Sequence, residues 1–170
     1  MRESPEDQFL KDLNSNIGIV HRVCKVYVKD AGEREDLYQE IIYQLWKSYP
    51  GFNGNSKFST WMYKVAMNTA INHIRKSSKA VQQEPLPEHL PEKPCISEAV
   101  QLEEKTRLLY DVINRLSPID KAIILLYLDD NSYDQIASVT GFTKTNVSVR
   151  LVRIKKQLEK ELKPVFKNNL

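Results

Sequence analysis

Prolines divide this chain into two parts. Four of its eight prolines fall within residues 79–97, which read KAVQQEPLPEHLPEKPCIS. Proline has no backbone N–H donor and disfavours helix in the residue before it, so a continuous helix is not expected through this segment. We therefore expect an extended, partly stiff linker at residues 79–97, with one small helical domain at residues 1–78 and another at residues 98–170.

Helical periodicity fills the segment before the linker. Apolar residues recur every three or four positions, and the period-two alternation typical of strands is absent. Helices are expected near Pro5–Val28, near Glu33–Tyr49 and from about Phe58 onward, with a turn at Gly32 between the first two. The apolar stripe of the first helix is Phe9, Leu13, Ile17, Val20 and Cys24. That of the second is Leu37, Ile41, Leu45 and Tyr49, joined by Ile42 and Trp46. That of the third is Phe58, Trp61, Met62, Val65, Ala66, Thr69, Ala70 and Ile74.

Four helices are expected after the linker, and the whole chain is therefore predicted to be all-α. The first is Glu98–Arg115, after which Ser117 can cap the second helix and Ser132 a short third one. Gly141 makes a turn, and Thr143 can cap a long basic final helix. The core stripe of that last helix is Val147, Leu151, Ile154, Leu158 and Leu162. A short helix, a tight turn and a longer basic helix are typical of a helix-turn-helix.

Acidic residues are missing from two long windows. No Asp or Glu occurs in residues 41–83 or in residues 135–158, whereas residues 84–134 carry eleven acids and five bases. The net charge is only +3, so the distribution of charge is more informative than its total. Two basic helical segments separated by an acidic one are typical of two contacts with a polyanion. Chance clustering on solvated helix faces is the alternative interpretation.

Cysteine and histidine usage does not favour enzymatic or metal chemistry. Cys24 and Cys95 form no CxxC pair, and His21, His73 and His89 are isolated. We therefore expect no catalytic residue, metal, cofactor or small-molecule substrate, and a reduced cytoplasmic setting. No apolar run reaches about 18 residues, and the N-terminus lacks the features of a secretion signal, so membrane insertion is not expected.

A polar loop leads into the third helix. The loop PGFNGNSK is rich in residues that permit special backbone angles, and Trp61 follows it at the start of the helix. The exposed side of that helix is expected to hold Lys64, Asn68, Ile71, Asn72, Arg75 and Lys76. A flexible polar loop beside aromatic side chains suits capture of an unstacked base, with basic residues following the backbone. Phe58 and Trp61 could instead be core anchors.

Two further helix faces carry candidate binding residues. On the second helix, the residues that project together are Asp36, Gln39, Glu40 and Tyr43. Acids in a first turn also complement the helix dipole, which is the simpler explanation. On the final helix, helical geometry directs five side chains outward, which are Thr145, Val149, Val152, Arg153 and Lys156. Asn146 and Ser148 lie at the flanks of this set. Such a set is typical of a surface that reads a DNA groove, although exposed valines could also mark a protein partner.

These segments, in this order and spacing, resemble a known family. Residues 36–76, DLYQEIIYQLWKSYPGFNGNSKFSTWMYKVAMNTAINHIRK, are similar to region two of the extracytoplasmic-function (group four) bacterial sigma factors. Residues 116–159 are similar to their region four, and a short linker replaces the third region, as in this subfamily. The resemblance implies a three-helix region-two domain at 1–78 and a helix-turn-helix region-four domain at 98–170. It implies a factor, not an enzyme, that binds core RNA polymerase, directs it to specific promoters and helps to melt the minus-ten region.

The resemblance also assigns site residues. Docking on the clamp helices of the polymerase's largest subunit falls to Asp36, Gln39 and Glu40, with Tyr43 on the same face. The resemblance assigns a flipped minus-ten base to the 52–57 loop, upstream minus-ten positions to Asn68, and minus-thirty-five contacts to Ser148, Arg150 and Arg153. With the exposed helix faces added, the candidate minus-ten residues are Phe52, Asn53, Asn55, Ser56, Lys57, Trp61, Lys64, Asn68 and Arg75. The candidate minus-thirty-five residues are Lys144, Thr145, Ser148, Val149, Arg150 and Arg153. Family membership further implies an anti-sigma factor that holds both domains until a signal arrives.

Two alternative interpretations explain fewer of these sequence features. A stand-alone helix-turn-helix regulator explains the C-terminal half but not the polar loop and aromatic helix start of the N-terminal half. A helical adaptor without a nucleic-acid role leaves both acid-free helices unexplained.

Overall fold

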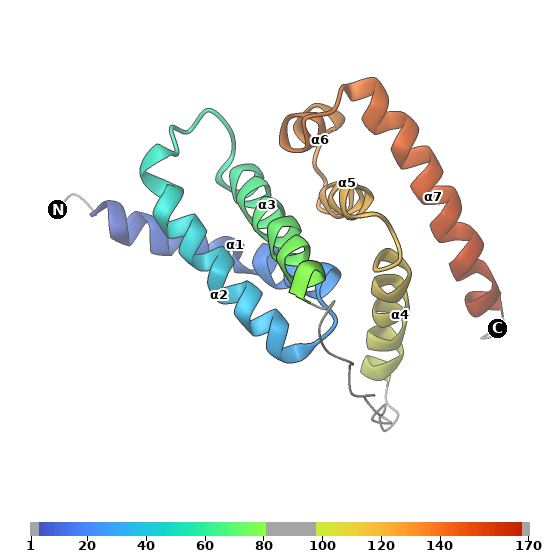
Figure 1. Ribbon diagram of the computed structural model, residues 1–170. Coiled ribbons are helices and arrows are strands. Elements are labelled where there is room, and N and C mark those ends of the chain that lie inside the picture. Colours follow the sequence, from blue (N-terminus) through green and yellow to red (C-terminus); the bar gives the residue numbers. More distant parts are fainter. Residues whose placement is uncertain (1–3, 81–97, 168–170) are drawn as a thin grey trace.

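Three helices form the N-terminal half of the protein. In the computed structural model, which describes residues 4–80 and 98–167, α1 spans Pro5–Tyr27, α2 Ala31–Ser48 and α3 Phe58–Ala80. A short 3-10 turn, η1, spans Tyr49–Gly51 after α2. The three helices pack against one another and run from blue to green in Figure 1. Apart from Lys79 and Ala80, the predicted linker lies outside the described residues.

The predicted apolar stripes form the core of this half. Phe9, Leu13 and Val20 of α1 are buried, and so are Leu37, Ile41 and Leu45 of α2. Helix α3 contributes Met62, Ala66, Thr69 and Ala70. Most of each predicted stripe is therefore buried or half-buried, because each helix turns its three-or-four-residue repeat toward the other two. The prediction is wrong for Trp46, which is 45% exposed.

The start of α2 corrects one prediction. The side chain of Asp30 accepts a hydrogen bond from the backbone N–H of Glu33, at 2.9 Å, and caps the helix. Helix α2 therefore begins at Ala31, and Gly32 lies within its first turn. The predicted turn at Gly32 is wrong by a few residues, because the Asp30 carboxylate satisfies backbone donors that the turn would have left free.

Four helices form the C-terminal half. They are α4 (Glu98–Ile113), α5 (Pro118–Leu128), α6 (Tyr133–Thr140) and α7 (Lys144–Lys167). Ser117 and Ser132 cap α5 and α6 as predicted, and Gly141 ends α6 with a φ of 78°. The Thr143 hydroxyl accepts from the backbone N–H of Asn146 at 3.2 Å and caps α7. Helix α4 ends two residues earlier than predicted, and the helix-turn-helix of α6 and α7 is present.

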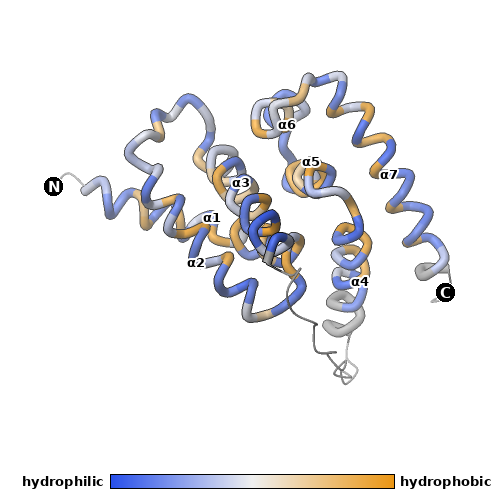
Figure 2. Tube along the Cα trace, in the orientation of Figure 1, coloured by the Kyte–Doolittle hydropathy of each residue, from blue (hydrophilic) through white to orange (hydrophobic). Residues whose placement is uncertain are grey.

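Helix α5 is the centre of the C-terminal half. Its residues 121–126 are all buried, and Figure 2 shows it as the most continuously hydrophobic helix of this half. Helix α7 instead alternates between hydrophobic and hydrophilic residues, and between Lys144 and Pro164 its buried residues are Val147, Leu151, Ile154 and Leu158. The opposite face of α7 is thus left exposed.

The two halves lie against each other. Helices α1 and α3 contact α4, α5 and α6, and the buried apolar residues of both halves form one continuous cluster. Figure 1 shows α3 and α6 on facing sides of this contact. No helix among the described residues is both long and apolar enough to span a bilayer.

Candidate nucleic-acid interface

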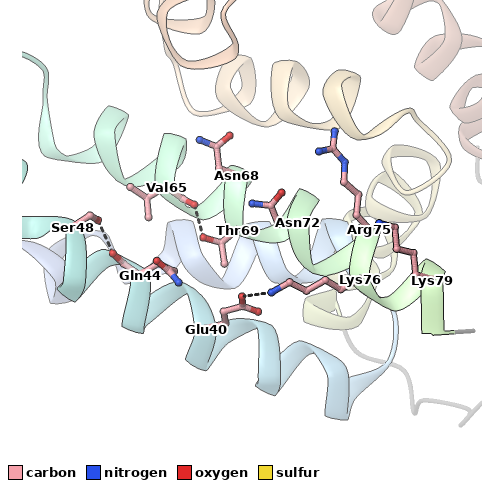
Figure 3. Close-up of a pocket in the computed structure, with 10 residues that line it drawn as sticks. All are labelled: Glu40, Gln44, Ser48, Val65, Asn68, Thr69, Asn72, Arg75, Lys76 and Lys79. Atoms are coloured by element: carbon pink, nitrogen blue, oxygen red, sulfur yellow. Dashed lines mark hydrogen bonds and ion pairs between the residues drawn. The ribbon is translucent and has the colours of Figure 1, made fainter.

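A groove of about 500 Å³ runs between α2 and α3 (Figure 3). Its lining is largely polar or basic and comprises Glu40, Gln44, Ser48, Val65, Asn68, Thr69, Asn72, Arg75, Lys76 and Lys79. Figure 3 shows Asn68, Asn72 and Arg75 projecting from α3 away from α2, whereas Lys76 reaches across to Glu40. Amides and cations along one helix can meet bases and phosphates of a nucleic-acid strand.

Residues 72, 76 and 79 extend the predicted minus-ten surface. Asn72 and Lys76, which the sequence placed on the exposed side of this helix without a specific minus-ten role, line the groove together with Lys79. Lys79 was not placed on that side from the sequence, although its spacing of four from Arg75 follows the helical repeat. The groove thus contains more cationic side chains than the family resemblance had indicated.

The predicted docking residues do not all face solvent. Asp36 and Gln39 are exposed, and Tyr43 is 58% exposed. Glu40 is turned into the groove, with its Oε2 3.2 Å from His73 Nδ1 and its Oε1 3.9 Å from Lys76 Nζ. Its carboxylate is therefore already paired with α3, and we infer that it fixes the spacing of α2 and α3.

Aromatic side chains hold the base of the 52–57 loop. The rings of Phe52 and Trp61 lie 5.1 Å apart, and Phe58 lies 5.6 Å from Phe52 and 5.4 Å from Trp61. Tyr49 joins this group and also contacts Phe9 of the core, at 4.8 Å. Each such pair of rings contributes roughly 0.5–1.5 kcal/mol of stabilisation beyond that due to its buried area. Phe52 and Trp61 therefore hold the loop in place.

The polar tip of the same loop is exposed. Asn53, Asn55, Ser56 and Lys57 face solvent. The backbone N–H of Asn55 donates to Asn53 Oδ1 at 3.1 Å, and Gly54 has a φ of 73°, which favours glycine. The loop therefore presents exposed amide, hydroxyl and ammonium groups beside a cluster of aromatic rings.

Helix α7 presents the surface predicted for groove reading. Lys144, Thr145 and Arg153 are exposed, and Ser148 is half-buried. Val149 and Val152 are 44% and 52% exposed, which is unusual for valines on a helix with a well-formed core stripe. The exposed face combines a guanidinium, hydroxyls and methyl groups, the groups that distinguish base pairs in the major groove.

Arg150 differs from its neighbours on α7. Its Nη1 donates to Asp120 Oδ1 at 2.8 Å, and its guanidinium carbon lies 4.8 Å from the centre of the Phe142 ring. Asp120 stands in the first turn of α5, where Ser117 donates to its other oxygen at 2.9 Å. Arg150 therefore joins α7 to α5 and helps to hold α7 in position.

We expect Arg150→Ala to lower the free energy of unfolding by about 1–2 kcal/mol, because a charge-assisted hydrogen bond and a cation–π contact are lost. Urea unfolding followed by circular dichroism measures this. Lys156→Ala, which removes an exposed cation from the same helix, is the matched control and should change stability little. Equal stability of the two variants, with a salt slope for DNA binding lower by about one in Arg150→Ala, would make Arg150 a phosphate contact instead.

Cys24 is chemically protected. It is 4% exposed, and burial raises the pKa of its thiol to about 11. The thiol is therefore protonated at neutral pH and poorly nucleophilic. Among residues 4–80 and 98–167, no three His, Cys, Asp or Glu side chains gather closely enough to hold a metal ion.

Family models match segments in both halves of the chain. The family model described as Sigma-70 region 2 matches residues 13–80, and that described as Sigma-70, region 4 matches residues 106–158. A Haemophilus influenzae protein, ECF RNA polymerase sigma-E factor, is 26% identical, over 77% of this chain and 75% of its own length. The Pseudomonas aeruginosa RNA polymerase sigma-H factor is 27% identical, over 93% of this chain and 86% of its own length. The chain belongs to the extracytoplasmic-function sigma factors.

Solved structures agree with this sigma-factor fold. The sigma factor RpoE of Bartonella quintana, solved in complex with the anti-sigma factor NepR, superposes with a TM-score of 0.75 at 20% identity, covering 92% of this chain and 97% of that one. CnrH, solved in complex with the cytosolic domain of CnrY, gives a TM-score of 0.65 at 15% identity, covering 92% of this chain and 88% of its own.

Membership of this family defines the general activity. The protein is a regulatory factor that binds core RNA polymerase and directs it to promoters for the initiation of transcription. The match over residues 13–80 decides against a stand-alone helix-turn-helix regulator, since it identifies the N-terminal half as sigma region two.

Proposed function

We propose that this sigma factor divides promoter opening and promoter reading between its halves. Residues 1–78 dock on core polymerase and open the minus-ten element, while residues 98–170 read the minus-thirty-five element through α7. The observation that carries this proposal is the row of amides and cations of α3 along one open groove between α2 and α3, two helices that the exposed 52–57 loop helps to connect. A strand separated from its partner offers both unstacked bases and phosphates, which this combination of groups can bind.

Each part of the N-terminal surface has a distinct role in the proposal. Asn55 and Ser56 at the loop tip receive a flipped base, and Asn68 reads an upstream position. Lys64 and Arg75 follow the phosphates, joined by Lys76 and Lys79 of the groove. Phe52 and Trp61 act by holding the loop rather than by stacking freely on bases, because both are half-buried in the aromatic cluster.

Permanganate footprinting tests the opening step, because permanganate oxidises unpaired thymines. The full chain, core polymerase and a cognate promoter should give reactive thymines confined to the minus-ten region. Core polymerase alone is the control and should give none. Polymerase bound at the promoter with no reactive thymines there would contradict the melting role while leaving promoter binding intact.

Docking on polymerase is proposed for the exposed part of the α2 face, which is Asp36, Gln39 and Tyr43. We expect Asp36→Lys to weaken core binding by roughly tenfold, mainly by slowing association, because reversed rim charges act on electrostatic steering. Glu35→Lys makes the same charge change at the adjacent exposed residue, about 100° around the helix, and is the matched control. Binding rates to immobilised core polymerase measure both. An equal loss in the two variants would remove the Asp36 face from the docking site.

We further propose that the protein works in the cytoplasm and is held inactive by an anti-sigma factor. Similarity to the sigma factor RpoE, solved in complex with the anti-sigma factor NepR, supports this partner class. The exposed valines of α7 offer apolar area that such a partner could cover, in competition with DNA.

A further inference from the structure

One acid lies in a groove that is otherwise cationic. Among the described residues that line the groove between α2 and α3, Glu40 is the one acid, whereas Arg75, Lys76 and Lys79 are bases. Glu40 stands on the α2 wall, and Figure 3 shows Lys76 reaching toward it across the groove. The Glu40 carboxylate therefore lies among the cations that the phosphates of a bound strand would need.

The carboxylate of Glu40 already occupies one of these cations. Its Oε1 lies 3.9 Å from Lys76 Nζ. A carboxylate and a phosphate both offer anionic oxygens to a lysine ammonium, so the two groups compete for it. The Lys76 side chain is 78% exposed, so solvent screens the pair and it adds little to stability. The charge of Glu40 therefore acts more on an incoming strand than on the fold.

His73 holds the carboxylate in the groove without cancelling its charge. Its Nδ1 lies 3.2 Å from Glu40 Oε2, and its Nε2 is buried with no hydrogen-bond partner among the described residues. A doubly protonated ring would carry a second N–H at Nε2, where it would find no acceptor. The geometry therefore fits a neutral ring that donates from Nδ1 to a carboxylate that keeps its negative charge.

We propose that Glu40 is an internal competitor of nucleic-acid phosphates and limits how tightly this groove binds a single strand. The proposal rests on the proposed function, because it takes the groove as the path of the separated minus-ten strand. Phosphate contacts carry no sequence information. Glu40 therefore weakens the binding of all strands alike and leaves base preference to the amides of α3.

Fluorescence anisotropy on the full chain, with a dye-labelled dT strand of about 20 nucleotides and no polymerase, tests this competition. Glu40→Gln removes the charge and keeps an oxygen that can accept from His73 Nδ1, so the contact between α2 and α3 is retained. Glu35→Gln is the matched control, because it makes the same change at an exposed residue of α2 that does not line the groove. Thermal melting followed by circular dichroism checks that each variant is folded.

We expect Glu40→Gln to tighten binding about fivefold at low salt, because it removes the repulsion between a carboxylate and a phosphate that lie a few ångströms apart in a solvated groove. The slope of log K against log salt should steepen by about 0.7, the value for one further phosphate contact of a single strand. Adding Lys76→Ala should abolish the gain, because the cation that Glu40 releases is then absent. Gln44→Glu places a second acid on the α2 wall and should weaken binding about fivefold, whereas Glu35→Gln should change neither affinity nor slope.

The sign of the effect separates this proposal from a purely structural role. If Glu40 only fixes the spacing of α2 and α3, Glu40→Gln will weaken binding or leave it unchanged while Lys76→Ala still weakens it, and that result would overturn the proposal. If Glu40→Gln, Lys76→Ala and Gln44→Glu all leave the affinity unchanged, the strand does not pass through this groove. The proposal then fails together with the part that the groove plays in the proposed function.

Discussion

We expect the combined substitution Asn55→Ala, Ser56→Ala and Asn68→Ala to reduce transcription from a duplex promoter by about 100-fold or more. Extracting a base from the duplex stack costs a few kcal/mol, which a protein pocket must offset. Three lost hydrogen bonds of about 1 kcal/mol each amount to roughly 3 kcal/mol. All three side chains are exposed in the free protein, so the substitutions should leave the fold unchanged.

A template whose minus-ten region is already open separates the loss of melting from the loss of base recognition. A promoter mismatched across the minus-ten region should partly restore activity to the triple variant, because melting is no longer required, although recognition of the flipped base stays lost. Asn14→Ala with Ser15→Ala, at exposed positions of α1 away from the groove, is the control and should transcribe normally. Full activity of the triple variant on duplex DNA would remove the loop and α3 from promoter opening.

The second large effect concerns sequence preference at the minus-thirty-five element. We expect Arg153→Ala to relax discrimination at one or two base pairs by about 1–3 kcal/mol, the range for a bidentate base contact. Val149→Ala should relax discrimination at a thymine, because it removes methyl groups that can contact the thymine methyl. Binding of the full chain with core polymerase to single-base promoter variants, at several salt concentrations, measures both.

Lys160→Ala is the control for this panel. Lys160 is exposed on α7, two turns beyond Arg153, so its loss should leave base preference unchanged. If Arg153→Ala and Val149→Ala also leave affinity and preference unchanged, α7 is not the reading helix. The exposed valines would then belong to a protein interface.

Local signals in the sequence predicted most of the fold. Ser117, Ser132 and Thr143 each precede a helix that they cap, because a side-chain oxygen can satisfy backbone donors that no residue of the helix satisfies. The period of the apolar residues identified most of the buried stripe of α1, α2, α3 and α7, although Trp46 of α2 is exposed. Such signals depend on neighbours within a few residues, which is why they could be interpreted without tertiary structure.

Contacts between distant residues could not be predicted in the same way. Glu40 has the spacing of an exposed docking residue, yet it pairs with His73, 33 positions away. Arg150 was assigned to DNA, but its partners include Asp120, 30 positions away. Helical geometry gives the direction of a side chain and not the group that it meets, so a charged residue at the edge of a stripe is ambiguous until the neighbouring helix is known.

The contact between the halves shows the same limit. Helix α1 buries Ile19, Val23 and Val26 in addition to its predicted stripe. These residues follow a helical repeat of their own, which indicates a second buried face. No local signal says that α1 also contacts α4 and α5, because tens of residues separate these helices from α1 along the chain.

Run-off transcription with purified core polymerase tests the central claim most directly. The full chain is added to core polymerase on a set of linear DNA fragments that carry candidate promoters, with core polymerase alone as the control. We predict discrete transcripts of defined length, from a subset of fragments, only when both components are present. A chain that is folded and binds core polymerase, yet yields no defined transcript from any fragment, would contradict the account.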